Sequence, residues 1–229
     1  FGGERIKDIM SRLSPDDDIP IEMGILTKQI EGAQKRVETH NFDIRKNVLQ
    51  YDDVMNKQRE IIYGQRRRVL MGEDIHDSIE EMLHETVEAR LALCAPPASK
   101  PDAWDLQGLY TELQQITGED YTGQLHGISS REELAEKAQE LVQQTYDKRE
   151  RDIVAAGANM REVERVMLLR AVDSHWMDHI DAMDQLRQGI GLQAIAQKDP
   201  VVAYRNAGFD MFDEMVVGIR ERTVRTLFH

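Results

Sequence analysis

Apolar positions with helical spacing dominate the first third of the chain. They recur in steps of three or four residues, and His40 and Gln58 are polar members of the same series. The apolar members are Leu26, Ile30, Ala33, Val37, Ile44, Val48, Tyr51, Met55 and Ile62. This spacing places the whole series on one face of an α-helix that no proline interrupts. At 1.5 Å per residue the stretch from Leu26 to Ile62 is roughly 55 Å long. We therefore expect a strut, ending near Leu70, on which other elements pack.

The rest of the pattern predicts shorter helices separated by breaks. A helix at 4–13 precedes a breaker-rich linker at 14–20, and further helical patterns cover 75–94, 104–116, 131–154, 161–187 and 201–227. Ser130 and Glu133 have the spacing of a capping box. The last two helices flank a connection bounded by glycine and proline, which predicts a helical hairpin. No stretch alternates apolar and polar residues with a period of two for long enough to form a strand, so the predicted fold class is all-α.

Composition narrows the function classes. The net charge of −13 over 229 residues argues against a general nucleic-acid coat, so no nucleic acid is expected as a partner. The single cysteine, Cys94, rules out a disulfide within this sequence. No run of apolar residues is long enough to span a bilayer. The sequence opens on Phe1-Gly2-Gly3 without an initiating Met, and we expect it to be a fragment of a longer protein.

Two histidines offer candidate metal ligands. His175 and His179 are four residues apart on one predicted helix, a spacing at which two side chains can share a metal. A metalloprotease helix carries a glutamate directly after the first histidine, whereas this chain has Trp176. No cysteine cluster offers further ligands. The favoured interpretation is two histidines on a half-exposed helix face, with no bound metal.

Nucleotide and anion sites are weakly indicated. Residues 189–194 have the glycine spacing of a dinucleotide loop, but a helix precedes them where that motif needs a strand. No GxxxxGK[ST] loop occurs, so this fragment is expected to bind no ATP. Arg66, Arg67 and Arg68 suit the C-terminal end of a helix dipole, and the alternative is contact with anionic lipid or an acidic partner. Asp52 and Asp53 are expected to be surface charges.

The connection at 188–200 is unusual for its apolar residues. Leu192 and Ile195 stand where polar residues are expected, which indicates that the tip of the hairpin touches a partner. The alternative, that both fold back onto the hairpin, stays open. Ile190 is expected to pack on the stem.

Two long motifs resemble one family, SecA, the bacterial preprotein translocase motors. NFDIRK at 41–46 and YDDVMNKQR at 51–59 resemble its long scaffold helix. MDQLRQGI at 183–190 and AQKDP at 196–200 resemble its two-helix finger, and FGGERI at 1–6 resembles the tail of its second nucleotide-binding domain.

The resemblance implies a domain organisation. It assigns 1–20 to the nucleotide-binding tail and linker, 21–70 to the long scaffold helix, 71–154 to a helical wing, and 155–229 to scaffold and finger.

The resemblance also implies an ATP-driven motor that moves preproteins through the SecYEG channel. The motor is cytoplasmic and peripherally associated with the inner face of the membrane. ATP and Mg²⁺ would be bound by the parent's nucleotide-binding domains, so this fragment has no cofactor or catalytic residue of its own. The implied partners are the preprotein, SecYEG and those domains, with an anionic lipid surface and a second copy of the chain as further candidates.

The resemblance places polypeptide contact at the finger tip. The contact residues are Gly189, Gly191, Leu192, Gln193, Ile195 and Lys198. Relatives usually carry histidine, arginine and an aromatic residue there, where this chain has Gly191, Gln193 and Ile195. We therefore expect plain apolar contact through Leu192 and Ile195. One rival hypothesis is a structural helical adaptor or coiled-coil module without motor function, and another is a metalloenzyme built on the two histidines.

Overall fold

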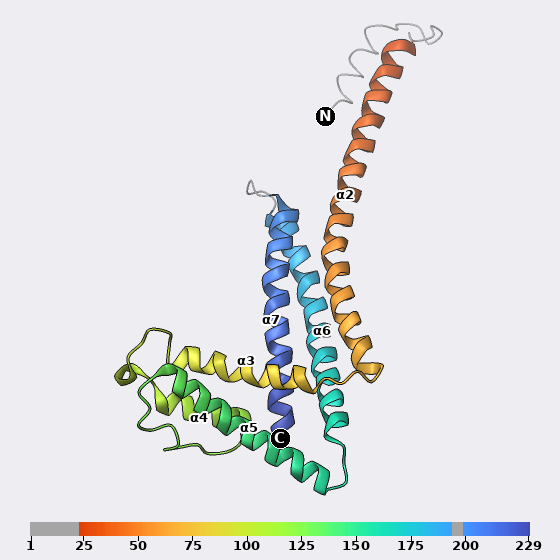
Figure 1. Ribbon diagram of the computed structural model, residues 1–229. Helices are drawn as coiled ribbons and strands as arrows, with labels where there is room; N and C mark the ends of the chain where they lie inside the picture. The colour runs from red at the N-terminus through yellow and green to blue at the C-terminus, as the bar shows by residue number, and fades with distance from the viewer. Residues whose placement is uncertain (1–22, 194–198) are drawn as a thin grey trace. The chain divides into compact units, whose positions relative to one another are not determined.

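The computed structural model describes residues 23–193 and 199–229, with side chains for 28–190 and 199–229 (Figure 1). The helices are α2 (Met23–Leu70), α3 (His76–Cys94), α4 (Leu106–Thr117), α5 (Arg131–Ala155), α6 (Met160–Gln193) and α7 (Pro200–Phe228), with a short 3₁₀ helix at Pro101–Ala103. No strand occurs among the described residues, which confirms the all-α prediction. The chain divides into two units, 1–52 and 53–229.

The second unit holds the hydrophobic core. Helices α6 and α7 run side by side as an antiparallel hairpin, and α3, α4 and α5 pack together as a smaller group (Figure 1). Buried side chains from all of these helices, and from the end of α2, form one cluster. Among its most buried members are Ile62, Ile79, Leu91, Leu109, Leu113, Leu134, Tyr146, Met160 and Leu227. The predicted hairpin of the last two helices is therefore confirmed.

Local side-chain caps explain several helix boundaries. The Ser130 hydroxyl accepts from the Glu133 backbone N–H at 3.1 Å, so α5 begins where the capping box predicts. Asp105 caps α4 in the same way by accepting from the Gly108 N–H at 2.8 Å. The fourth helix consequently begins at Leu106, whereas the sequence pattern predicted a start at Trp104.

The apolar face of α2 is exposed along the first part of the helix. Ile30, Val37, Ile44 and Val48 are 51%, 59%, 47% and 47% exposed. In the first unit the described residues all belong to this one helix, so no other described element of that unit covers the face. In the second unit the same series is covered, since Met55 is half-buried and Ile62 is only 1% exposed.

Helix α6 extends farther than predicted. The pattern placed its end near Arg187, but the helix continues to Gln193 through Gly189 and Gly191. A glycine costs roughly 1 kcal/mol in a helix, and the continuing apolar face of Met183 and Ile190, both buried, offsets that cost. The predicted helix at 4–13, the linker at 14–20 and residues 194–198 lie outside the described residues.

None of the described helices combines the length and the apolar content that crossing a bilayer requires.

Candidate functional site: the α6–α7 hairpin and its supports

The predicted contact residues lie at the end of the hairpin. Gly189 is exposed on α6, and Gly191, Leu192 and Gln193 belong to the last turns of that helix. Ile195 and Lys198 lie outside the described residues. Ile190 is 8% exposed, which confirms that it packs on the stem. On the other side of the tip, Asp199 accepts from the Val201 N–H at 2.9 Å and caps α7.

A buried polar bracket joins the hairpin to α2. The Gln58 side chain is 3% exposed, and its Nε2 donates to the Gly208 carbonyl of α7 at 2.8 Å. Its Oε1 lies 2.9 Å from His179 Nε2 on α6. Because a carbonyl can only accept, the amide nitrogen must face Gly208 and the amide oxygen must face His179. His179 therefore carries its proton on Nε2 and donates to Gln58.

Aromatic rings enclose His179. Its ring centroid lies 5.7 Å from that of Trp176 and 5.8 Å from that of Phe212. The side chain is 4% exposed, and this burial lowers the pKa of His179. The neutral ring is thus a structural hydrogen-bond donor. The expectation that both histidines lie on a half-exposed face is wrong for His179 and holds for His175, which is half-buried.

The two histidines make separate contacts. His179 Nε2 is used by Gln58, and His175 packs toward Gly218, where an added Cβ would lie 2.8 Å from its Cε1. Within the described ranges, no group of three or more His, Cys, Asp or Glu side chains is arranged to hold a metal ion.

A second buried polar cluster lies at the base of α6. The Glu164 side chain has no exposed surface, and its Oε1 lies 2.8 Å from Arg161 Nη1 and 3.3 Å from His76 Nδ1. The Tyr146 hydroxyl of α5 donates to the same oxygen. The cluster therefore links the starts of α3 and α6 to α5. Sequence reasoning missed Glu164, although the residue occupies an apolar position in the series Met160, Glu164, Leu168.

Burial dominates the ionisation of this cluster. Desolvation raises the pKa of Glu164, although the Tyr146 hydrogen bond and the Arg161 charge act in the opposite direction. Desolvation, followed by the hydrogen bond to Glu164, raises the pKa of Tyr146. Tyr146 is therefore a neutral proton donor, and the cluster serves as a structural tie.

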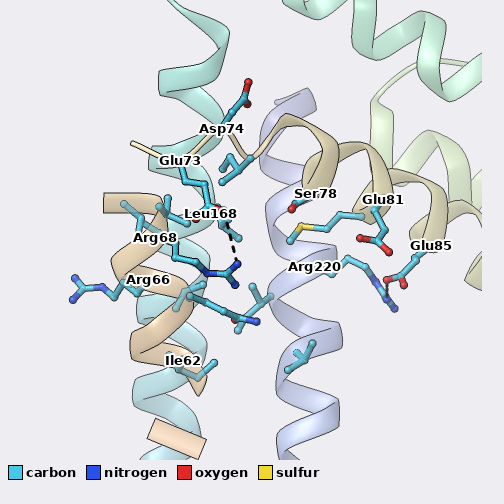
Figure 2. A pocket seen from close by; sticks show the side chains of 18 residues that line it. Ile62, Arg66, Arg68, Glu73, Asp74, Ser78, Glu81, Glu85, Leu168 and Arg220 are labelled. Carbon is cyan, nitrogen blue, oxygen red and sulfur yellow. Dashed lines mark hydrogen bonds and ion pairs between the residues drawn. The ribbon is translucent and has the colours of Figure 1, made fainter. Parts of the chain in front are cut away.

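A cavity of about 340 Å³ lies where the end of α2 meets α3, α6 and α7 (Figure 2). Its apolar lining includes Ile62, Val69, Leu168, Val172 and Ile219, and charged side chains from α2, α3, α7 and the segment between α2 and α3 also line it.

Three arginines that line this cavity form ion pairs. Arg66 Nε lies 3.0 Å from Asp173 Oδ1, Arg68 lies 3.9 Å from Glu73, and Arg220 pairs with Glu85. Two of the three arginines that end α2 are thus held in ion pairs, while Arg67 is exposed. Asp52 and Asp53 are both exposed, as predicted.

The fold and these supports define a class of protein, a helical scaffold that carries a two-helix finger. The SecA wing and scaffold domain family matches residues 20–229, and the chain belongs to that family. The chain is 51% identical over 231 residues to the protein translocase subunit SecA of Pelotomaculum thermopropionicum, an alignment covering 100% of this chain and 26% of the relative. It is 49% identical over 231 residues to the protein translocase subunit SecA 1 of Clostridioides difficile, covering 100% of this chain and 25% of the relative.

These relatives are much longer than this chain. The chain spans about a quarter of the length of the curated relatives it matches. Membership of the family does not favour the rival hypothesis of a helical adaptor without motor function.

Proposed function

We propose that this chain is the mechanical scaffold and polypeptide-contacting finger of an ATP-driven translocase that moves preproteins through the SecYEG channel. The observation that carries the proposal is the family match over residues 20–229, together with a two-helix hairpin that Gln58 of α2 joins by hydrogen bonds. The parent acts at the inner face of the membrane. Preprotein, channel and the parent's own nucleotide-binding domains are its partners.

Within this proposal each part of the chain has a mechanical role. Residues 21–70 form the scaffold helix, 71–154 the wing, and 155–229 the scaffold and finger, with 1–20 as the tail of the second nucleotide-binding domain. ATP and Mg²⁺ bind to those domains in the parent. The exposed apolar face of α2 at Ile30, Val37 and Ile44 provides a surface against which they pack.

The finger tip is the proposed contact with the moving polypeptide. A tip that accepts unfolded segments of any sequence benefits from undirected apolar contact, since hydrogen-bond readout would select particular sequences. Leu192 and Ile195 supply such contact. The helices behind the tip transmit movement because their buried faces pack together along the hairpin.

Replacement of Leu192 and Ile195 by Asp in the full-length parent tests this role. We expect preprotein transport into inverted vesicles to fall at least tenfold, while the basal ATPase rate and the melting temperature stay unchanged. The matched control is Val166→Asp with Met177→Asp, because both side chains are exposed on the same helix away from the tip. The control should transport normally.

Two results would contradict the proposal. Normal transport by a stably folded tip variant would exclude the tip as the contact. Loss of transport together with the melting transition would show that Leu192 and Ile195 are core residues.

A further inference from the structure

Polar groups buried between helices can specify how the helices align. A single buried polar residue fixes the register of a helix pair because only one alignment satisfies its hydrogen bonds. Gln58 occupies a position of this kind, since it interrupts the apolar series of α2 and is buried against both helices of the hairpin. Both ends of its amide are used, one by each helix.

The hydrogen bonds of Gln58 tolerate little displacement. A slip of one residue would turn a side chain by about 100°, and a slip of one turn would shift it by about 5.4 Å. The two observed distances, 2.8 Å to Gly208 O and 2.9 Å to His179 Nε2, leave no room for either change. A slipped alignment would leave buried amide and imidazole groups without partners, and that is costly.

The shape of α7 adds an independent constraint at the same place. A Cβ on Gly208 would lie 2.7 Å from Met183 Cε on α6 and 3.6 Å from Val54 Cγ1 on α2. Side chains of α6 and α2 therefore occupy the space that a side chain at position 208 of α7 would need. One turn away on the same face, α7 carries Tyr204 and Phe212, which are too large for this contact.

We propose that Gln58, His179 and Gly208 form a register lock that fixes the axial position of the finger on the second part of α2. The finger can slide along that part of α2 only by breaking both hydrogen bonds and displacing Met183. The locked parts move together, and displacement of α2 carries the tip with it. Only this mechanical consequence rests on the proposed function; the lock itself is a property of the 229-residue chain.

Distance measurements between spin labels test the lock directly. Labels are placed on cysteines at Lys57 of α2 and Asp210 of α7, both exposed, in a chain whose Cys94 is replaced by Ala. The test variant is the double substitution Gln58→Leu with His179→Leu, which removes both polar partners and keeps the interface apolar. The matched control is Thr223→Val, because Thr223 is equally buried but bonds only within its own helix, to Ile219 O at 2.7 Å.

The lock predicts one narrow distance between the labels at Lys57 and Asp210, both in the labelled chain without further substitutions and in the control. The double variant should melt at or above the temperature of Gln58→Leu alone, because replacing both partners avoids an unpaired buried group. Its distance distribution should nevertheless broaden, with components displaced by about one helical turn of 5.4 Å.

A second pair of labels distinguishes a shift of the hairpin along α2 from a general loosening of helix packing. Labels at Asp181 and Asp210 lie on the two helices of the hairpin, and both residues are exposed. This distance should stay narrow in the double variant. A single unshifted Lys57–Asp210 distance in the folded double variant would overturn the lock. Failure of the double variant to fold would overturn the lock too. In that case the hydrogen bonds of Gln58 would be needed for the stability of the fold, whereas the proposal says that they fix the alignment of the helices.

Discussion

Single polar residues at apolar positions decide how the hairpin is held. Gln58 and Glu164 each continue an apolar series in the sequence, and each is buried in the structure with hydrogen-bond partners on neighbouring helices. Buried polar groups are costly unless they are paired. The hydrogen bonds of these buried groups therefore contribute more to the alignment of the helices than to net stability. For Gln58, the neutral ring of His179 is one of the two partners.

The lowered pKa of His179 predicts a pH effect on stability. Because burial places the folded-state pKa below that of the unfolded chain, the unfolded state binds more protons as the pH falls below about 6.5. Stability from the neutral ring is present above that pH and is lost as the pH falls through the folded pKa. One proton limits the slope to about 1.4 kcal/mol per pH unit.

Urea unfolding at pH 7.5 and pH 5.5 measures this effect. The unsubstituted 229-residue chain should lose more stability on acidification than the His179→Gln variant. The glutamine of that variant does not titrate and can still donate a hydrogen bond to Gln58. The raised pKa of Glu164 has the opposite sign, with stability lost as pH rises through its folded pKa, but Glu164 is present in both proteins and cancels. Equal losses in the two proteins would mean that His179 titrates as an exposed histidine does.

At the scale of elements, one helix has two environments. The first part of α2 exposes Ile30, Val37, Ile44 and Val48, while the second part buries Gln58, Ile62 and Val69. The same spacing of apolar residues runs through both parts. Periodicity identifies the face of a helix that can be buried, but a neighbouring element must be present to bury it.

Adjacent isoleucines on α2 give a matched test of that difference. Ile62 is 1% exposed and Ile61 is 50% exposed, although the two share residue type and helix. Ile62→Ala should lower the free energy of unfolding by about 2–5 kcal/mol through lost burial and a cavity. Ile61→Ala should change it by no more than about 0.5 kcal/mol. Equal effects in urea unfolding would show that the assigned face of α2 is incorrect.

At the scale of the whole molecule, the two units differ in what supports them. The second unit has a core to which its helices contribute, whereas the described part of the first unit is one helix. Helices in water draw most of their stability from packing of an apolar face. If the proposed function is right, the first part of α2 depends for protection on the other domains of the longer protein.

Amide hydrogen exchange tests this dependence. In the 229-residue chain, amides at 28–50 should exchange much faster than those at 58–69, since unpacked helical segments open locally at low cost. In the full-length parent the first set should become protected while the second changes little. Strong protection of 28–50 in the isolated chain would indicate a partner surface within the chain itself, or self-association.

The sequence by itself determined the helical class, most helix boundaries and the hairpin. Those features follow from local causes: the 3.6-residue period and the Ser130 cap act through neighbouring residues. The sequence motifs also indicated the SecA family, which the comparison over residues 20–229 then showed.

Only the tertiary structure decided which part of the long apolar face is covered, that Gln58 meets both His179 and Gly208, and that Glu164 is buried. Gln58 lies 121 residues from His179 and 150 from Gly208, so no local pattern relates them. Periodicity specifies a direction around one helix axis. It does not specify which distant helix arrives there, because that depends on how all the helices pack at once.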